Sequence, residues 1–172
     1  MGESKAKVAV VMGSDSDLPS LKGAFEILEK FQIPYVARII SAHRTPAEAA
    51  KFASSAEGDG VQVIVCAAGM AAHLAGVVAA HTILPVIGIP MPCEPFNALD
   101  SLFSTVNMPP GVPVATVSAG KAGGTNAALL AVSMLALADK ELGAKLKEFR
   151  QRQSDKVRKA DTEVMDKIKA ML

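Results

Sequence analysis

The sequence predicts an α/β protein, a three-layer α/β/α sandwich of flavodoxin-like type with a parallel sheet and an extra C-terminal helix. Two observations carry this prediction. Short apolar runs alternate with helical patterns along the 172 residues, and the connections are short, which is typical of right-handed parallel crossovers. The apolar runs are nearly continuous instead of alternating with polar residues, which favours strands that are buried on both faces.

Each element follows from its own pattern. Leu18–Phe31 has helical periodicity with Pro19 near its start, and Pro46–Ala56 opens on proline, a good first helical residue. Six of the ten prolines fall between Pro90 and Pro113, in a loop that is expected to hold a short helix. The five predicted strands cover residues 7–12, 36–40, 61–67, 85–89 and 114–117, and the other helices cover about 71–81, 97–106, 126–138 and 141–172.

Length and composition predict one domain over residues 1–172, with its own core. Gly60–Cys93 carries no Asp, Glu, Lys or Arg, but polar residues and a proline break it into strand, helix and strand, so we expect no membrane span. We identify no signal peptide, and the two cysteines, Cys66 and Cys93, form no disulfide framework, which favours a cytoplasmic protein. The net charge of +1 gives no reason to expect nucleic-acid binding, and no histidine–cysteine cluster has metal-ligand spacing.

The last predicted helix, residues 141–172, differs from the rest in charge. Lys140–Leu172 carries ten Lys or Arg and six Asp or Glu, a net +4, whereas residues 1–139 carry a net −3. Its apolar residues recur at near-helical steps from Leu142 to Met171, with Gln153 interrupting the stripe. Because the domain core already has its covering helices, we expect this helix to pack on a neighbouring subunit; a solvated helix face is the alternative explanation of the charge.

The most informative stretch is Ser41–Pro46, which joins a predicted strand to a helix start. It holds His43 and Arg44 at the carboxyl end of a strand, where open α/β sheets place ligands. An arginine offers a planar fork for phosphate or carboxylate, and a histidine can move a proton near neutral pH. The pair therefore predicts an anionic small molecule and proton-transfer chemistry, with a surface pair flanking a helix start as the alternative.

A second candidate loop, Gly13–Asp17, follows the first strand and opens a helix. Its glycine permits a close turn, and the helix start presents free N–H groups to an anion. The serine hydroxyls can add donors, and Asp17 can bind sugar hydroxyls. Ordinary capping, with Asp17 or Ser16 satisfying the N–H groups of the helix start, is the competing interpretation and the more common use of such loops.

Two more loops end predicted strands. Cys66–Gly76 is rich in small residues, which permit close approach of a ligand or of a helix to the sheet. Tight helix packing explains this stretch as well, with His73 as a satisfied histidine at a helix start. Gly120–Asn126 is expected to be a flexible connection into a helix that Thr125 or Asn126 caps, with contact to an anion as the alternative.

The loops after strands one, two and three would meet along one edge of the sheet, and together they predict a nucleotide-sized site. Other classes of protein fit less well. A dinucleotide fold requires G-x-G-x-x-G where this chain has G-S-D-S-D, and flavin binding requires aromatic cover that is scarce here. The non-enzymatic alternative is a receiver-like phosphoacceptor domain, which Lys121 would suit. Such a domain requires an aspartate at the end of the third strand, where this chain has Cys66–Gly69, and we reject it.

Taken together, these residues resemble the PurE family, the 5-(carboxyamino)imidazole ribonucleotide mutases of purine biosynthesis. The resemblance covers essentially the whole chain, and the S-A-H-R-T-P form of residues 41–46 is similar to the bacterial mutase class. The class that carboxylates aminoimidazole ribonucleotide directly with CO₂ more often reads S-A-H-K. The matching motifs lie at residues 11–17, 41–46, 72–74, 100–104, 108–109 and 126–130.

The resemblance implies an enzyme without metal or other cofactor that moves CO₂ from the exocyclic nitrogen of a ribonucleotide carbamate to C4 of its imidazole. It implies that His43 is the general acid and base, and that Ser14, Asp17 and Arg44 hold the ribonucleotide. It also implies a homo-octamer with sites at subunit junctions; direct carboxylation of aminoimidazole ribonucleotide stays open as the alternative reaction. The residues that match pocket-lining positions are Ser16, Ser41, Ala42, Gly69, His73 and Leu74.

This chain also departs from the family pattern. Ala67 and Met70 stand where the family usually has glycine, and Ala75 stands where it has proline. The loop 92–98 differs from the usual serine- and glycine-bearing form, and Asn107 replaces a common glutamine. These changes are expected to affect the pocket wall and to leave the proton-transfer and phosphate groups intact.

Overall fold

A five-stranded parallel sheet forms the centre of the computed structural model, which describes residues 5–172. The strand order is β2-β1-β3-β4-β5, and every pair of neighbouring strands is parallel. Each connection between strands that follow one another in the sequence therefore crosses over one face of the sheet. The predicted parallel sheet is therefore confirmed. The strands are β1 Val8–Met12, β2 Tyr35–Ile39, β3 Val63–Gly69, β4 Val86–Met91 and β5 Ala115–Thr116.

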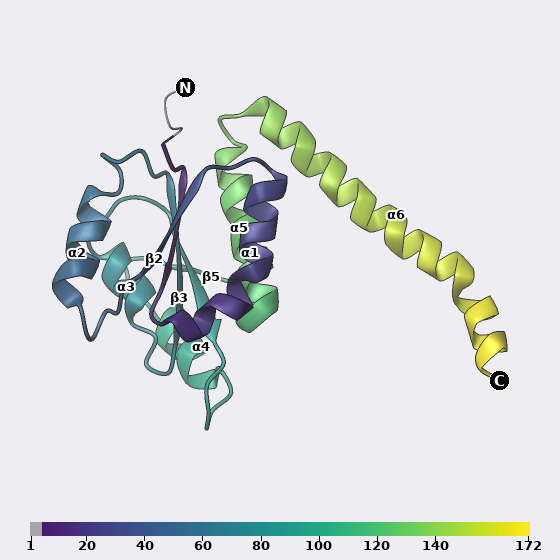
Figure 1. Ribbon diagram of the computed structural model, residues 1–172, viewed down its shortest axis with the longest axis horizontal. Coiled ribbons are helices and arrows are strands. Elements are labelled where there is room, and N and C mark those ends of the chain that lie inside the picture. Colours follow the sequence, from purple (N-terminus) through teal and green to yellow (C-terminus); the bar gives the residue numbers. More distant parts are fainter. Residues whose placement is uncertain (1–4) are drawn as a thin grey trace. The chain divides into compact units, whose positions relative to one another are not determined.

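Helices cover both faces of this sheet, which confirms the three-layer prediction. Helices α1 and α5 lie together on one side, and α2 and α3 lie on the other (Figure 1). A single 3₁₀ turn, η1, precedes α1, and α4 lies in the proline-rich segment where a short helix was predicted. The helices are η1 Asp15–Asp17, α1 Leu18–Lys30, α2 Pro46–Ser55, α3 Leu74–Ala79, α4 Leu99–Val106, α5 Gly120–Leu135 and α6 Lys140–Met171.

The chain divides into two compact units, one ending at Met134 and one covering Leu135–Leu172. The second unit consists mainly of α6, the predicted C-terminal helix, which is capped at its start because the Asp139 carboxylate accepts a hydrogen bond from the Leu142 N–H. Within residues 5–172, no helix is both long and apolar enough to cross a membrane.

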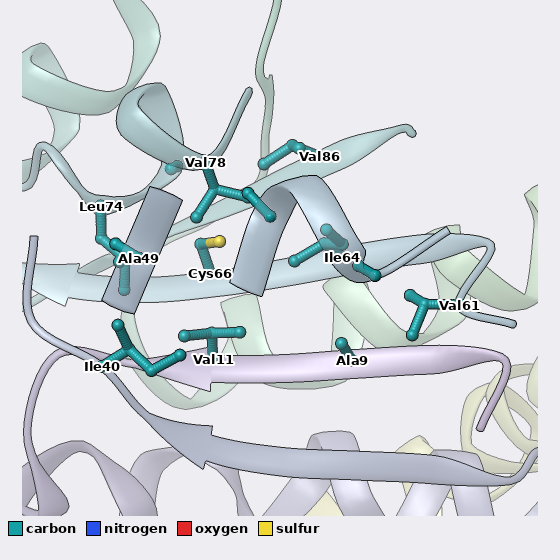
Figure 2. Packing of buried hydrophobic residues seen from close by; sticks show 13 residues of the cluster. Ala9, Val11, Ile40, Ala49, Val61, Ile64, Cys66, Leu74, Val78 and Val86 are labelled. Carbon is teal, nitrogen blue, oxygen red and sulfur yellow. The ribbon is translucent and has the colours of Figure 1, made fainter. Parts of the chain in front are cut away.

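One hydrophobic cluster packs α2 and α3 against the sheet (Figure 2). Val11 and Ile64 come from neighbouring strands, and Ala49 brings α2 close because its side chain is small. Full burial of an aliphatic side chain contributes about 1.5–3 kcal/mol, so the central strands, buried along nearly their whole length, dominate the stability of this unit. Burial also raises the pKa of the Cys66 thiol in this cluster, which therefore stays protonated and chemically inert.

Strand β2 does not fit the expectation that every strand is buried on both faces. Its residues are half-buried or exposed, and Ile39 exposes 57% of its surface. The physical reason is topological: β2 is an edge strand, which pairs only with β1 and is covered less completely than the strands between others. Hydrophobic runs in the sequence do not distinguish an edge strand from a central one.

Helix α5 begins six residues earlier than predicted, at Gly120, so the expected flexible connection and the caps at Thr125 and Asn126 are wrong. Gly120 adopts the left-handed conformation with φ of 61°. Gly123 lies so close to the preceding strand end that a Cβ would collide with the carbonyl oxygen of Ser118. The glycines that suggested flexibility serve tight packing of the first helical turn.

Helix α4 has polar side chains on its buried side and apolar side chains on its exposed side, the opposite of an ordinary surface helix. Its buried side carries hydroxyls, because Ser101 Oγ donates to the carbonyl oxygen of Met91 at 2.9 Å and Thr105 Oγ1 donates to that of Ser101 at 2.7 Å. Its outer side is apolar, and Phe103 exposes 55% of its surface. A Cβ at Gly88 of β4 would collide with the Thr105 side chain, so only small residues fit between helix and sheet.

Candidate active site

The loop after β1 folds into a capping box. Ser14 Oγ accepts a hydrogen bond from the Ser16 N–H at 3.3 Å, and an Asp17 carboxylate oxygen accepts one from the Ser14 N–H at 3.3 Å. Capping therefore occurs in this loop, but the capping side chain is Ser14 and not Ser16, while Asp17 takes part as the third residue of the box and makes no cap bond to α1. The box fixes the loop at the carboxyl end of β1, with the serine hydroxyls exposed on its outer side.

Asp17 is a buried acid in this loop. Loss of hydration on burial raises the pKa of the Asp17 carboxyl above its ordinary value, the hydrogen bond from Ser14 opposes the rise, and the nearby Asp15 charge adds to it. The group consequently keeps its proton to a higher pH than an exposed aspartate does. In the protonated form it can donate a hydrogen bond as well as accept one.

The loop after β2 is tied to the loop after β1 through Arg44. Its Nη2 donates to the carbonyl oxygen of Gly13 at 3.0 Å, and its Nε donates to Ser41 Oγ at 3.3 Å. Ser41 Oγ also accepts the Arg44 backbone N–H at 3.1 Å. The guanidinium group thus bridges two loops that lie far apart in sequence.

His43 contacts His73, the predicted site residue that directly precedes α3. Its Nε2 is 2.8 Å from Nδ1 of His73, and the two rings meet edge to face with centroids 4.9 Å apart. One of these two nitrogens carries the shared hydrogen, so the rings orient each other. His73 stands at the N-cap of α3 without capping it, and its ring instead joins the loop after β3 to the loop after β2.

These loops line an open cavity of about 580 Å³ at the carboxyl edge of the sheet. Its polar side comes from the loops after β1 and β2, and its apolar side comes from the loop after β3, with Cys93 added from the end of β4. Every predicted site residue except His73 lines it, and His73 touches it through His43. The lining residues are Gly13, Ser14, Ser16, Asp17, Ser41, Ala42, His43, Arg44, Ala68, Gly69, Met70, Ala71, Leu74 and Cys93.

Cys93 and Met70 line this wall, in agreement with the expectation that these departures from the family pattern affect the pocket wall, although neither is among the predicted site residues. Cys93 follows β4 at the same edge of the sheet as the predicted loops, and that placement was the available signal. A Cβ at Gly69 would lie 2.5 Å from Cys93 Sγ and 3.3 Å from the carbonyl oxygen of Met91, so the thiol fills the space that this glycine leaves. Residues 120–126 do not line the cavity, although they too follow a strand.

A second hollow, of about 460 Å³, lies between β2 and α2 toward the amino ends of the strands. It is lined by opposite charges, including Arg38, Lys51 and Glu48, and by the ring of Phe52, with Arg38 5.9 Å from the ring centroid. It contains no imidazole and none of the predicted site residues. The groups that can transfer a proton and bind an anion together are in the carboxyl-edge cavity.

An open parallel sheet with imidazoles, a guanidinium and a buried carboxyl at its carboxyl edge defines a small-molecule enzyme of the α/β class. Comparison with known proteins identifies the family. The family model described as AIR carboxylase matches residues 7–156, and the chain belongs to this family. The resemblance to PurE proteins that the sequence motifs indicated is therefore confirmed.

Relatives align over nearly their full length. The N5-carboxyaminoimidazole ribonucleotide mutase of Escherichia coli is 49% identical over 152 residues, covering 88% of this chain and 90% of the relative. The enzyme of the same name from Mycobacterium tuberculosis is 50% identical over 160 residues, covering 93% and 91%. The crystal structure of Treponema denticola PurE superposes with a TM-score of 0.82 at 29% identity, covering 91% of this chain and 96% of that one.

Proposed function

We propose that this chain is an isomerase of purine biosynthesis that converts N5-carboxyaminoimidazole ribonucleotide into 4-carboxy-5-aminoimidazole ribonucleotide. The observation that carries the proposal is that one cavity contains both the His43 imidazole and the Arg44 guanidinium. The imidazole can transfer protons at neutral pH, and the guanidinium can bind the anionic nucleotide. Relatives that align along nearly their whole length carry the name of this mutase, which supports the same reaction here.

The proposed reaction breaks one bond and forms another. The nitrogen–carbon bond of the carbamate breaks with its electron pair left on nitrogen, which takes a proton from His43 as CO₂ is released into the cavity. The enamine-like ring then attacks CO₂ through C4 and forms the new carbon–carbon bond. His43, now unprotonated, removes the C4 proton, and the ring regains its aromaticity. Protons balance, and the enzyme returns to its starting state.

The two sides of the cavity suit the two parts of this substrate. Ser14, Asp17 and Arg44 on the polar side hold the ribose phosphate, and His73 orients the His43 ring through the 2.8 Å contact. The apolar side offers CO₂ a place next to C4, where proximity replaces a bimolecular encounter. The remaining residues assigned to the pocket are Ser16, Ser41, Ala42, Gly69 and Leu74.

The experiment that tests this function compares two substrate sets. Purified protein receives either the carbamate or aminoimidazole ribonucleotide with bicarbonate, and the carboxylated product is followed for each. The proposal requires a higher kcat/KM with the carbamate. A higher value with aminoimidazole ribonucleotide and bicarbonate would identify the chain as a direct carboxylase, and no product from either would reject both reactions.

Replacing Arg44 with lysine is expected to weaken ribonucleotide binding roughly tenfold, which corresponds to about 1.4 kcal/mol and to one charge-assisted hydrogen bond. Lysine keeps the charge, but its ammonium group has no planar fork. It cannot donate to Ser41 and Gly13 together and bind phosphate at the same time. Calorimetric titration measures the Kd. Arg38→Lys, the same exchange outside the cavity, is the matched control and should bind the ribonucleotide like the original protein. An unchanged Kd in Arg44→Lys would show that Arg44 does not bind the ribonucleotide.

We further propose that residues 1–172 act as one domain of a cytoplasmic homo-oligomer, an octamer, in which α6 of one copy packs on a neighbour. The apolar outer face of α4, with Leu99, Leu102 and Phe103 exposed, supports assembly, since such a face is stabilised when another copy covers it. The two cysteines form no disulfide, which is consistent with a reducing compartment.

A further inference from the structure

Helix α6 carries a mainly apolar stripe that repeats every eleven residues (Figure 1). Eleven residues make close to three full turns of an α-helix, so the stripe stays on one side of the helix along its whole length. An eleven-residue repeat is typical of helices that pair with a slight right-handed supercoil. The first repeat falls at positions 142, 146 and 149, and the next two are Gln153, Val157, Ala160, Val164, Ile168 and Met171.

The chain covers the first part of this stripe and leaves the rest exposed. Leu142 and Phe149 are buried, whereas Val157, Val164 and Met171 are exposed. The net charge changes along the helix as well. Residues 140–156 carry six Lys or Arg and three Asp or Glu, a net +3, whereas residues 157–172 carry four and three, a net +1. The distal part of α6 is therefore an exposed apolar stripe on a nearly neutral helix, and its charge does not oppose pairing with an identical helix.

Two charged side chains beside the exposed stripe have no ion pair. Among the charged residues of 152–172, all within the described part of the chain, only Lys156 and Asp161 lack one; the pairs are Arg152–Glu148, Arg158–Asp155, Lys159–Glu163, Lys167–Glu163 and Lys169–Asp166. Lys156 and Asp161 are five residues apart and lie on opposite edges of the stripe. They therefore do not face each other within one helix, where paired side chains are three or four residues apart.

A second copy of the helix provides a partner for both side chains. When two identical helices lie parallel and in register, the edge that carries Lys156 in one faces the edge that carries Asp161 in the other. Twofold symmetry makes this contact twice. In an antiparallel pair each edge faces its own counterpart, and the edge of Lys156 also carries Lys145 and Lys167 at eleven-residue steps. Like charges would then face each other, so the charge pattern favours the parallel arrangement.

We propose that residues 153–172 of α6 form a parallel, in-register helix pair with the same residues of a second copy of this chain. The apolar stripe supplies most of the attraction, and the contacts between Lys156 and Asp161 select the orientation. This inference goes beyond the proposed mutase reaction and does not depend on it, because none of these residues lines the carboxyl-edge cavity. It also lies beyond residue 156, where the match to the family model ends, for most of its length.

The test introduces one cysteine at a time into α6 of the full chain, because two identical positions form a disulfide only if they lie close together. Val157→Cys and Met171→Cys are about 21 Å apart along the helix, and only a parallel, in-register pair brings each next to its own counterpart. Thr162→Cys, on the opposite side of the helix, is the matched control. Non-reducing electrophoresis after mild oxidation measures the linked fraction, and the original protein, with Cys66 and Cys93, gives the background.

Val157→Cys and Met171→Cys should each be linked on the order of fivefold more than Thr162→Cys. Links above the control at neither position would overturn the helix pair. A link between positions 157 and 171, formed only when the two variants are mixed, would overturn the parallel orientation.

A charge exchange in the Val157→Cys protein tests the contact between Lys156 and Asp161. Adding Asp161→Lys places positive charges on both facing edges and should lower the linked fraction on the order of threefold. Adding Lys156→Glu as well restores opposite charges across the pair and should recover the linked fraction. An equal linked fraction in all three proteins would overturn the role of these two residues in selecting the orientation.

Discussion

Replacing His43 with asparagine is expected to lower kcat by at least about 10²-fold, the effect typical of losing a general acid and base. Asparagine keeps a polar side chain but cannot carry a proton to the leaving nitrogen or accept one from C4. The affinity for the ribonucleotide should change little, because nucleotide binding is assigned to Ser14, Asp17 and Arg44 and not to His43. Single-turnover kinetics with the carbamate measures the chemical step, and calorimetry measures binding.

The matched control for this variant is His73→Asn. In our proposal His73 orients the His43 ring through one contact between Nδ1 and Nε2, so its loss should shift the pH profile of kcat and lower kcat less than loss of His43 does. Turnover close to that of the original protein in His43→Asn would reject His43 as the proton carrier. If His73→Asn were then inactive, the assignment would move to His73.

Ending the chain after Ala144 is expected to yield a smaller species by light scattering, with reduced turnover if the sites lie at subunit junctions. The truncation removes most of α6, on which several large apolar side chains are exposed, Val157 by 69% and Met171 by 86%. Their burial on another copy could stabilise assembly by up to roughly 1.5–3 kcal/mol each before entropic losses. The net charge of +4 on this segment also complements the −3 of residues 1–139.

Two point variants of the full chain separate assembly from truncation damage. Ile168→Glu places a charge on the apolar stripe of α6 and should shift the mass toward smaller species, whereas Lys159→Gln changes an exposed polar position and should not. Circular dichroism shows whether the helix content is kept. A truncated protein with its full oligomer mass and full turnover would show that α6 is dispensable for both.

The sheet and the order of its helices were predictable because each follows from a local pattern. Continuous apolar runs such as Val63–Ala67 are typical of strands covered on both faces of a parallel sheet, and short connections leave few ways to join them. The exposure of strand β2 and the start of α5 were not predicted correctly. Exposure of an edge strand depends on strand order, and the first turn of α5 depends on how closely Gly123 approaches Ser118, neither of which appears in a local pattern.

The candidate site, like the fold, could be predicted from the sequence only in part. Residues on loops after strands, such as Ser14 and Arg44, were predictable because the carboxyl ends of parallel strands meet at one edge. The contact between His43 and His73 was not, since it joins residues thirty positions apart and depends on where α3 begins. The chain expected to be helical from about residue 71 instead turns at Met70, and α3 begins at Leu74.

The bridge that Arg44 makes to Gly13 and Ser41 has a consequence for how the enzyme meets its ligand. Because the guanidinium already donates to both loops, part of the conformational entropy lost on ordering this long side chain belongs to folding and not to binding. Association then needs no slow rearrangement of these two loops. We expect the rate of nucleotide association to rise linearly with nucleotide concentration, without the plateau that a preceding isomerisation of the loops would impose.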